Sequence, residues 1–282
     1  MEATTPSLTD LLSMGSAPAG PVELALGGGQ LDAVARERIA QILADDAMGI
    51  RCGRTPMLDR WRVRRDGGPS ATGSAKKALA TYAGIGFGLP ARPASDDHLQ
   101  GLVAELLWNR LIWERRACTQ NRRLIHAHSV KPDPLEPGGD GLVIYDTGDG
   151  TALLFRLWEI KKHMAQAPYS STINRASRQL LSRGTEYLAK LAGPETVEQP
   201  GPLGELYQEI IELWLDRSER AGTGISLATA TEHGPIGPRA FNSLVTSFEE
   251  FGTPGQLEGI VVTISAYDQF ANRVRNIVWS GL

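Results

Sequence analysis

Three residues with reactive side chains cluster around one predicted β-hairpin. Asp140 lies in the run GGDG, while Glu159 and Lys161 lie in the run WEIKK. Side chains along a strand alternate between its two faces, so Glu159 and Lys161 continue the apolar face that precedes them. A tight turn at residues 147–150 places Asp140 opposite residues 157–159. Two acids and one lysine are therefore expected to meet at one end of this hairpin.

Paired carboxylates of this kind are typical of a Mg²⁺ site, with Mn²⁺ as the alternative. Such hard cations take a few protein oxygens and keep other positions for water and phosphate. The backbone carbonyl of Ile160 offers a third oxygen from the same strand. A protonated Lys161 cannot bind the metal, but the side chain can orient or deprotonate a water, or balance charge on a phosphate. Flanking glycines are expected to leave the backbone around Asp140 open to a bulky polyanion.

An aspartate followed, after one hairpin, by Glu-x-Lys resembles the PD-(D/E)XK nuclease superfamily. Asp140 and the run Glu159-Ile160-Lys161 carry the likeness, although Pro137 lies three residues before the aspartate instead of next to it. The superfamily has an acid on the helix before the hairpin, and Glu105 is similar to it. It often has a polar residue on the helix after the hairpin, and Gln179 is similar to that one. The likeness covers residues 95–192.

This resemblance implies a restriction-endonuclease-like mixed β-sheet flanked by helices, and a Mg²⁺-dependent deoxyribonuclease that hydrolyses phosphodiester bonds. Asp140, Glu159, the Ile160 carbonyl and Glu105 would hold the metal, Lys161 would align the water, and Gln179 would support the catalytic site. DNA is the implied substrate, with RNA as the alternative. The resemblance also suggests the effector subunit of a bacterial defence or restriction complex, acting with a larger partner such as a helicase, an ATPase or a sensor subunit.

Two arginine-rich segments, residues 51–65 and 110–123, are expected to guide the nucleic-acid backbone without reading its sequence. Trp61 is the best placed aromatic residue for base stacking. The net charge of −3 argues against binding by charge alone, and a solvated charged face is the alternative for both segments. The candidate nucleic-acid contacts are Arg60, Arg62, Arg64, Arg65, Arg122, Arg123 and Lys162.

Simpler interpretations remain open for the same residues. Glu105 could pair with a nearby arginine, and Asp140 could be a turn residue. Glu159 and Lys161 could end a strand in solvent, and Gln179 could be a helix-surface amide. The alternative for the whole chain is a non-catalytic interaction subunit that keeps a nuclease-like fold.

His126 and His128 form a separate pair of potential metal ligands. They are two residues apart and hence share one face of a strand. With no cysteine nearby, ordinary packing or surface roles are favoured for both.

The 282 residues form an α/β chain with no apolar run long enough to span a membrane. Its two cysteines cannot build a disulfide framework, which favours a reducing cytoplasm. Residues 1–92 are expected to form an N-terminal extension, with an irregular mobile arm over 1–30, a helix over 31–49 and a loop or edge segment at the arginines. Residues 93–282 are expected to form the nuclease-like domain.

Within that domain, apolar periodicity and turn residues predict further elements. Helices are expected over 95–116, 171–193, 203–222 and 238–252, and a helix, with a strand as the alternative, over 267–279. Strands are expected over 122–130, 224–230 and 257–266, in addition to the hairpin. A linker is expected over 194–202.

Overall fold

A computed structural model describes most of the chain. The described residues are 7–53, 55–115, 122–128, 130, 139–148, 150, 152–164, 167–233, 236–237 and 239–282. Within them, no helix combines the length and the apolar character that crossing a membrane requires.

Seven strands of the described chain form one sheet, in the spatial order β1-β2-β9-β8-β7-β6-β5. The pairs from β2 through β9 and β8 to β7 are parallel, and the pairs at both ends are antiparallel. The α/β class expected from the sequence is therefore confirmed, with a mixed sheet. The strands are β1 (Gly15–Ala17), β2 (Glu23–Gly27), β5 (Arg123–Ala127), β6 (Gly141–Asp146), β7 (Leu153–His163), β8 (Thr223–Thr229) and β9 (Leu257–Thr263).

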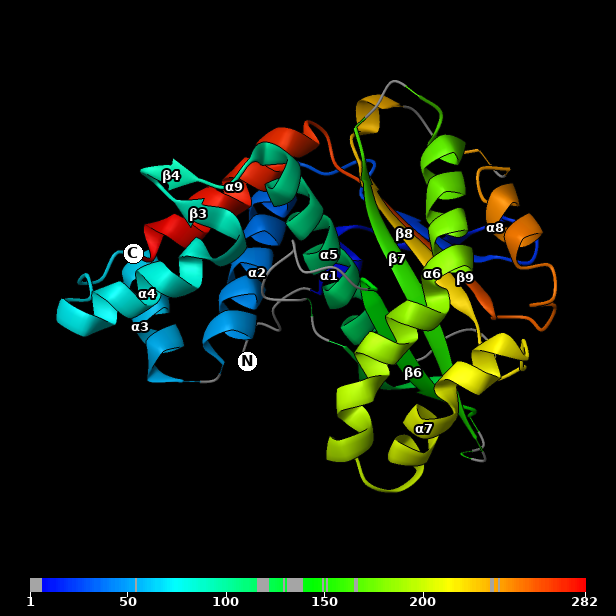
Figure 1. The fold of residues 1–282 in the computed structure, drawn as a ribbon. Helices are drawn as coiled ribbons and strands as arrows, with labels where there is room; N and C mark the ends of the chain where they lie inside the picture. The colour runs from blue at the N-terminus through cyan, green and yellow to red at the C-terminus, as the bar shows by residue number, and fades with distance from the viewer. Residues whose placement is uncertain are drawn as a thin grey trace.

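Helices cover both faces of this sheet (Figure 1). One core lies between the sheet and α1 (Leu8–Leu11), α2 (Ala33–Cys52), α3 (Pro56–Arg65), α4 (Gly73–Phe87), α5 (Asp96–Glu114) and α9 (Tyr267–Ser280). The other core lies between the sheet and α6 (Tyr169–Glu198), α7 (Gly201–Leu215) and α8 (Asn242–Ser247). A short hairpin of β3 (Gly88–Leu89) and β4 (Arg92–Pro93) and a 3₁₀ turn, Thr231–His233, complete the described elements.

The hairpin that carries the predicted site forms as the sequence indicates. β6 and β7 pair antiparallel from Gly141 opposite Trp158 to Asp146 opposite Leu153. Phe155 and Leu157 pack in the core under α6 and α7, whereas Trp158 packs in the core under α5, with its ring 5.9 Å from the Trp108 ring. The odd-numbered residues of β7 therefore face α6, and the even-numbered residues face α5.

Local sequence signals also explain α5. The Ser95 side chain accepts a hydrogen bond from the backbone N–H of His98, and Asp96 and Asp97 lie in the first turn, where they complement the helix dipole. Apolar residues at helical spacing then bury the face that contacts β7.

The N-terminal segment differs from its prediction. In place of an irregular arm, residues 8–27 form α1, β1 and β2, and β2 pairs parallel with β9. The region is rich in Pro, Gly, Ser and Thr, so its sequence does not indicate a strand. The strand partner of β2 lies more than 200 positions away in the sequence. The sheet thus joins residues from both sides of the boundary expected near residue 92.

Two other segments are helical where the sequence predicts loops. The arginine-rich segment forms α3, with Thr55 at its N-cap and Pro56 in its first turn, a position that proline favours. The linker expected over 194–202 is mostly helix, because α6 continues through Pro194 to Glu198. The last element, α9, confirms the favoured helix over residues 267–279.

Candidate functional site at the end of the β6–β7 hairpin

Asp140, Glu159 and Lys161 meet where β6 and β7 separate. The described pairing of β6 with β7 ends at Gly141 and Trp158, while β7 continues beside β8 as far as His163. The Asp140 carboxylate lies at this exposed edge of β7, where its Oδ2 accepts a hydrogen bond of 2.8 Å from the backbone N–H of Ile160. Since the N–H and C=O of one strand residue point to the same edge, the Ile160 carbonyl faces this side too.

Glu159 is a fully buried carboxylate with one oxygen left without a donor. Its side chain is 0% exposed, and Oε1 accepts a hydrogen bond from the Lys161 ammonium. Among the described residues, no donor reaches Oε2. Burial, together with the adjacent Asp140 carboxylate, raises the pKa of Glu159 to about 8 although the Lys161 ammonium lowers it. The site therefore disfavours two adjacent carboxylate charges, and a bound cation would allow both groups to ionise.

Lys161 is a charged donor in this arrangement. Burial disfavours its ammonium, but the negative charges of Glu159 and Asp140 outweigh burial and hold the pKa of Lys161 above its ordinary value. Of the three roles considered for this lysine, orienting a water and balancing phosphate charge fit a protonated amine, whereas deprotonating a water does not.

Helix α6 contributes a row of side chains above this end of the hairpin. The Gln179 amide donates a hydrogen bond of 2.7 Å to the Tyr187 hydroxyl, and Tyr187 lies close enough to Lys161 to affect its pKa. The guanidinium of Arg183 lies 4.9 Å from the centre of the Tyr187 ring. Neither Tyr187 nor Arg183 was predicted from the sequence as part of this site. Arg183 and Tyr187 lie four and eight residues after Gln179, on the same face of the helix. This spacing was the sequence signal that could have identified them.

The glycines around Asp140 allow close packing on both sides. A Cβ at Gly141 would lie 2.1 Å from the Trp108 ring, and a Cβ at Gly139 would lie 2.9 Å from the Cβ of Tyr187. The backbone beside Asp140 is thus enclosed between α5 and α6, which corrects the expectation that the glycines leave it open to a bulky polyanion. Gly138 lies outside the described residues.

Glu105 approaches from the opposite layer. It is a half-buried residue of α5, which packs on the face of the sheet opposite to Glu159 and Lys161 (Figure 1). Burial raises the pKa of the Tyr267 phenol, and the nearby Glu105 charge raises it further. Glu105 therefore belongs to the layer on the other side of the sheet from Glu159 and Lys161.

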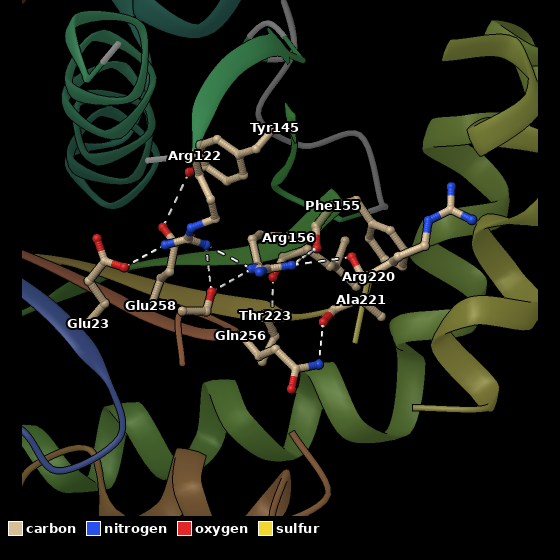
Figure 2. A network of polar contacts seen from close by, with 12 residues as sticks. Glu23, Arg122, Tyr145, Phe155, Arg156, Arg220, Ala221, Thr223, Gln256 and Glu258 are labelled. Atoms are coloured by element: carbon tan, nitrogen blue, oxygen red, sulfur yellow. Dashed lines mark hydrogen bonds and ion pairs between the residues drawn. The ribbon is translucent and has the colours of Figure 1, made fainter. Parts of the chain in front are cut away.

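Arg122 belongs to a buried ion-pair network and not to an exposed surface (Figure 2). It is 3% exposed and pairs with Glu23 on β2 and, at 3.0 Å, with Glu258 on β9. Arg115 pairs with the same two acids, and Arg156 on β7 lies 3.7 Å from Glu258. This network joins the amino-terminal ends of the parallel strands, which lie at the opposite end of β7 from Glu159. Because the Arg122 guanidinium is used in this network, it is not available to a phosphate.

Most basic residues of α3 are engaged within the protein. Arg62 and Arg65 both pair with Asp45, and Arg64 donates to the carbonyl of Gly68. Figure 1 shows α3 separated from β7 by α2 and α5. The Trp61 ring is 0% exposed and donates to the Val278 carbonyl, so it cannot stack on a base.

The other predicted contacts differ in exposure. Arg60 is exposed on α3, and the Arg123 side chain is 70% exposed while paired with Asp146. Lys162 contacts Asp97 and, at 3.1 Å, Gln100 at the start of α5. Arg60 and Arg123 are the predicted contacts that solvent reaches most readily.

The structure also brings His126 and His128 together with Glu195, which sequence reasoning did not connect to them. Burial, together with the neighbouring His126, lowers the pKa of His128 to about 4. The third residue comes from α6, far along the chain.

Comparisons with known proteins give no assignment. No family model matches the chain, and no curated protein matches it either.

Proposed function

We propose that the chain is a metal-dependent nuclease of the PD-(D/E)XK kind, which hydrolyses phosphodiester bonds in DNA. The observation that carries this proposal is the buried Glu159, with one oxygen lacking a donor, placed against Asp140 and Lys161 where β6 and β7 separate. The order α5-β5-β6-β7-α6-α7-β8, in which β5 to β7 form a meander and β8 lies parallel to β7, also supports the restriction-endonuclease-like fold.

Each residue has a defined role in this proposal. Asp140, Glu159 and the Ile160 carbonyl are the oxygen donors for Mg²⁺, with Mn²⁺ as a substitute. When bound, the ion supplies Lewis acidity and an activated water. Lys161 donates to the attacking water or to a phosphate oxygen, and its positive charge opposes the negative charge that develops there. Glu105 supports the site from α5, and Gln179 supports it through Tyr187.

The substrate would approach the exposed edge of β7, where β6 and β7 separate, next to α6. Arg183, whose side chain is 45% exposed beside Tyr187, is the cation best placed to contact a backbone phosphate there. We extend the proposal to an effector subunit that a larger partner, such as a helicase, an ATPase or a sensor subunit, brings to nucleic acid.

A cleavage assay tests this function. The purified chain is incubated with supercoiled plasmid, linear duplex, single-stranded DNA and RNA, each with Mg²⁺, with Mn²⁺ and with chelator. We expect cleavage of DNA that chelator abolishes. Glu159→Gln and Lys161→Met should each lower the rate by at least about a hundredfold, since they remove a metal donor and the charged water-orienting group.

Exposed residues of the same types provide matched controls. Glu209→Gln on α7 and Lys77→Met on α4 should cleave at the wild-type rate. Unchanged metal-dependent cleavage in both site variants would refute the assignment. Metal binding without cleavage of any substrate would favour the alternative, an interaction subunit that keeps a nuclease-like fold.

A further inference from the structure

His126, His128 and Glu195 converge at the edge strand β5. One ligand atom from each residue lies within 4.8 Å of the other two, and all three side chains are half-buried. His126 lies on β5, His128 directly follows this strand, and Glu195 lies in the last turns of α6. The three residues meet only in the folded chain.

A β-bulge directs the two histidines toward α6. Leu124 pairs with Tyr145 and His126 pairs with Ile144, so Ile125 is an extra residue in β5. Tyr145 belongs to the core under α5, whereas Ile144 belongs to the core under α6 and α7. Without the bulge, His126 would share the face of Leu124. With it, both histidines face Glu195, and bulges commonly re-aim side chains at functional sites in this way.

Neighbouring residues hold two of the three side chains in position. The His128 Nε2 lies 3.1 Å from the Tyr207 hydroxyl on α7. The Gln199 amide donates a hydrogen bond of 3.0 Å to Glu195 Oε2. The His126 ring contacts the His128 ring edge to face, with 5.1 Å between the ring centres. Partners of this kind orient the ligands of protein metal sites.

We propose that His126, His128 and Glu195 bind a transition-metal ion of the Zn²⁺ class. Imidazole nitrogen suits zinc and its neighbours, whereas Mg²⁺ prefers oxygen, so this site differs in chemistry from the carboxylates of Asp140 and Glu159. Tetrahedral zinc places its ligand atoms roughly 3.3 Å apart, and the three ligand atoms here already lie within 4.8 Å of one another. Two histidines and one glutamate leave the fourth position for water.

The bound ion would cross-link β5 to α6. In the described part of the chain, β5 pairs with β6 alone and is one edge of the sheet. A metal held by β5 and α6 therefore stabilises an edge that has strand partners on one side only. This role is independent of the proposed nuclease activity.

Zinc binding by the full chain tests this proposal. The measurements use the Glu159→Gln background, so that the other carboxylate site contributes little. After removal of metal with chelator, equilibrium dialysis should show one saturable Zn²⁺ per chain that excess Mg²⁺ does not displace. Co²⁺ at the same stoichiometry should show the visible absorption of tetrahedral coordination, and Zn²⁺ should raise the melting temperature.

Variants assign the site. His126→Gln and Glu195→Gln should each abolish this binding and the rise in melting temperature. Tyr207→Phe, which keeps all three ligands, should weaken the affinity about tenfold or more. His98→Gln and Glu198→Gln, elsewhere on α5 and α6, should bind like the parent. Absence of saturable zinc binding in the parent would overturn the proposal, as would unchanged affinity in Glu195→Gln and Tyr207→Phe.

Discussion

Replacing Glu159 with glutamine should stabilise the protein when no divalent metal is present. The ordinary pKa of a glutamate is 4.5, and burial beside Asp140 raises that of Glu159 to about 8. Between these values the folded protein holds a proton that the unfolded chain has released, so the free energy of unfolding falls as the pH rises. Neutral glutamine avoids this penalty, and its amide can donate to Asp140.

The expected gain follows from the same pKa difference. Each pH unit above 4.5 lowers the wild-type free energy of unfolding by about 1.4 kcal/mol, up to the folded-state pKa. At pH 7 the Glu159→Gln variant should therefore be more stable than the wild type by up to about 3 kcal/mol. For a chain of this length, the melting temperature should rise by roughly 5–10 °C.

Urea denaturation in chelator, followed by circular dichroism at pH 5, 6, 7 and 8, measures this effect. The stability difference between Glu159→Gln and wild type should be small at pH 5 and grow steadily toward pH 8. Glu209→Gln, at an exposed surface pair with Arg220, should change stability by less than about 1 kcal/mol at every pH. A Glu159→Gln protein less stable than wild type at pH 8, or a difference that does not grow with pH, would refute the reasoning.

Further measurements test other parts of the structure. Mg²⁺ at 100 times its dissociation constant should stabilise the wild type by about 2.7 kcal/mol in thermal melts but leave the stability of Glu159→Gln unchanged. Equal stabilisation of both proteins would show that Glu159 is not a metal ligand. Gly141→Ala should destabilise the protein by about 1–3 kcal/mol in urea denaturation because the new methyl group meets Trp108. Gly101→Ala, which has open space around it in α5, should stabilise the protein by about 0.5–1 kcal/mol. Equal effects of the two substitutions would contradict this packing. Glu258→Gln should lower the free energy of unfolding by about 3–5 kcal/mol because buried arginines lose their partner. Glu37→Gln, in an exposed pair with Arg273, should lower it by less than about 1 kcal/mol. An unchanged stability of Glu258→Gln would indicate that the network contributes little.

The parts of the fold that sequence reasoning predicted are those with local signals. A Ser95 cap and apolar spacing mark α5, and alternation around a tight turn marks the β6–β7 hairpin. The meeting of Asp140 with Glu159 also follows locally, because one turn sets the register of both strands.

The parts that could not be predicted depend on distant partners. Strand β2 has little pattern of its own and exists because β9 pairs with it. From the sequence, Arg122 is indistinguishable from a surface cation. Its partners Glu23 and Glu258 lie on strands that are distant in the sequence. Trp61 lies in a charged segment, yet α9 covers its ring. In each case tertiary contacts override the local signal.

The position of β9 in the sheet has a consequence for how the chain is made. Among the described strands, β9 is synthesised after all the others, yet it lies between β2 and β8. Until residues 257–263 leave the ribosome, β2 has no parallel partner, and β8 presents an open edge to other chains. Long-range pairing of this kind is slow and exposes strands to aggregation. We therefore expect chains that stop short of β9 to accumulate as insoluble material, with the β6–β7 hairpin already complete.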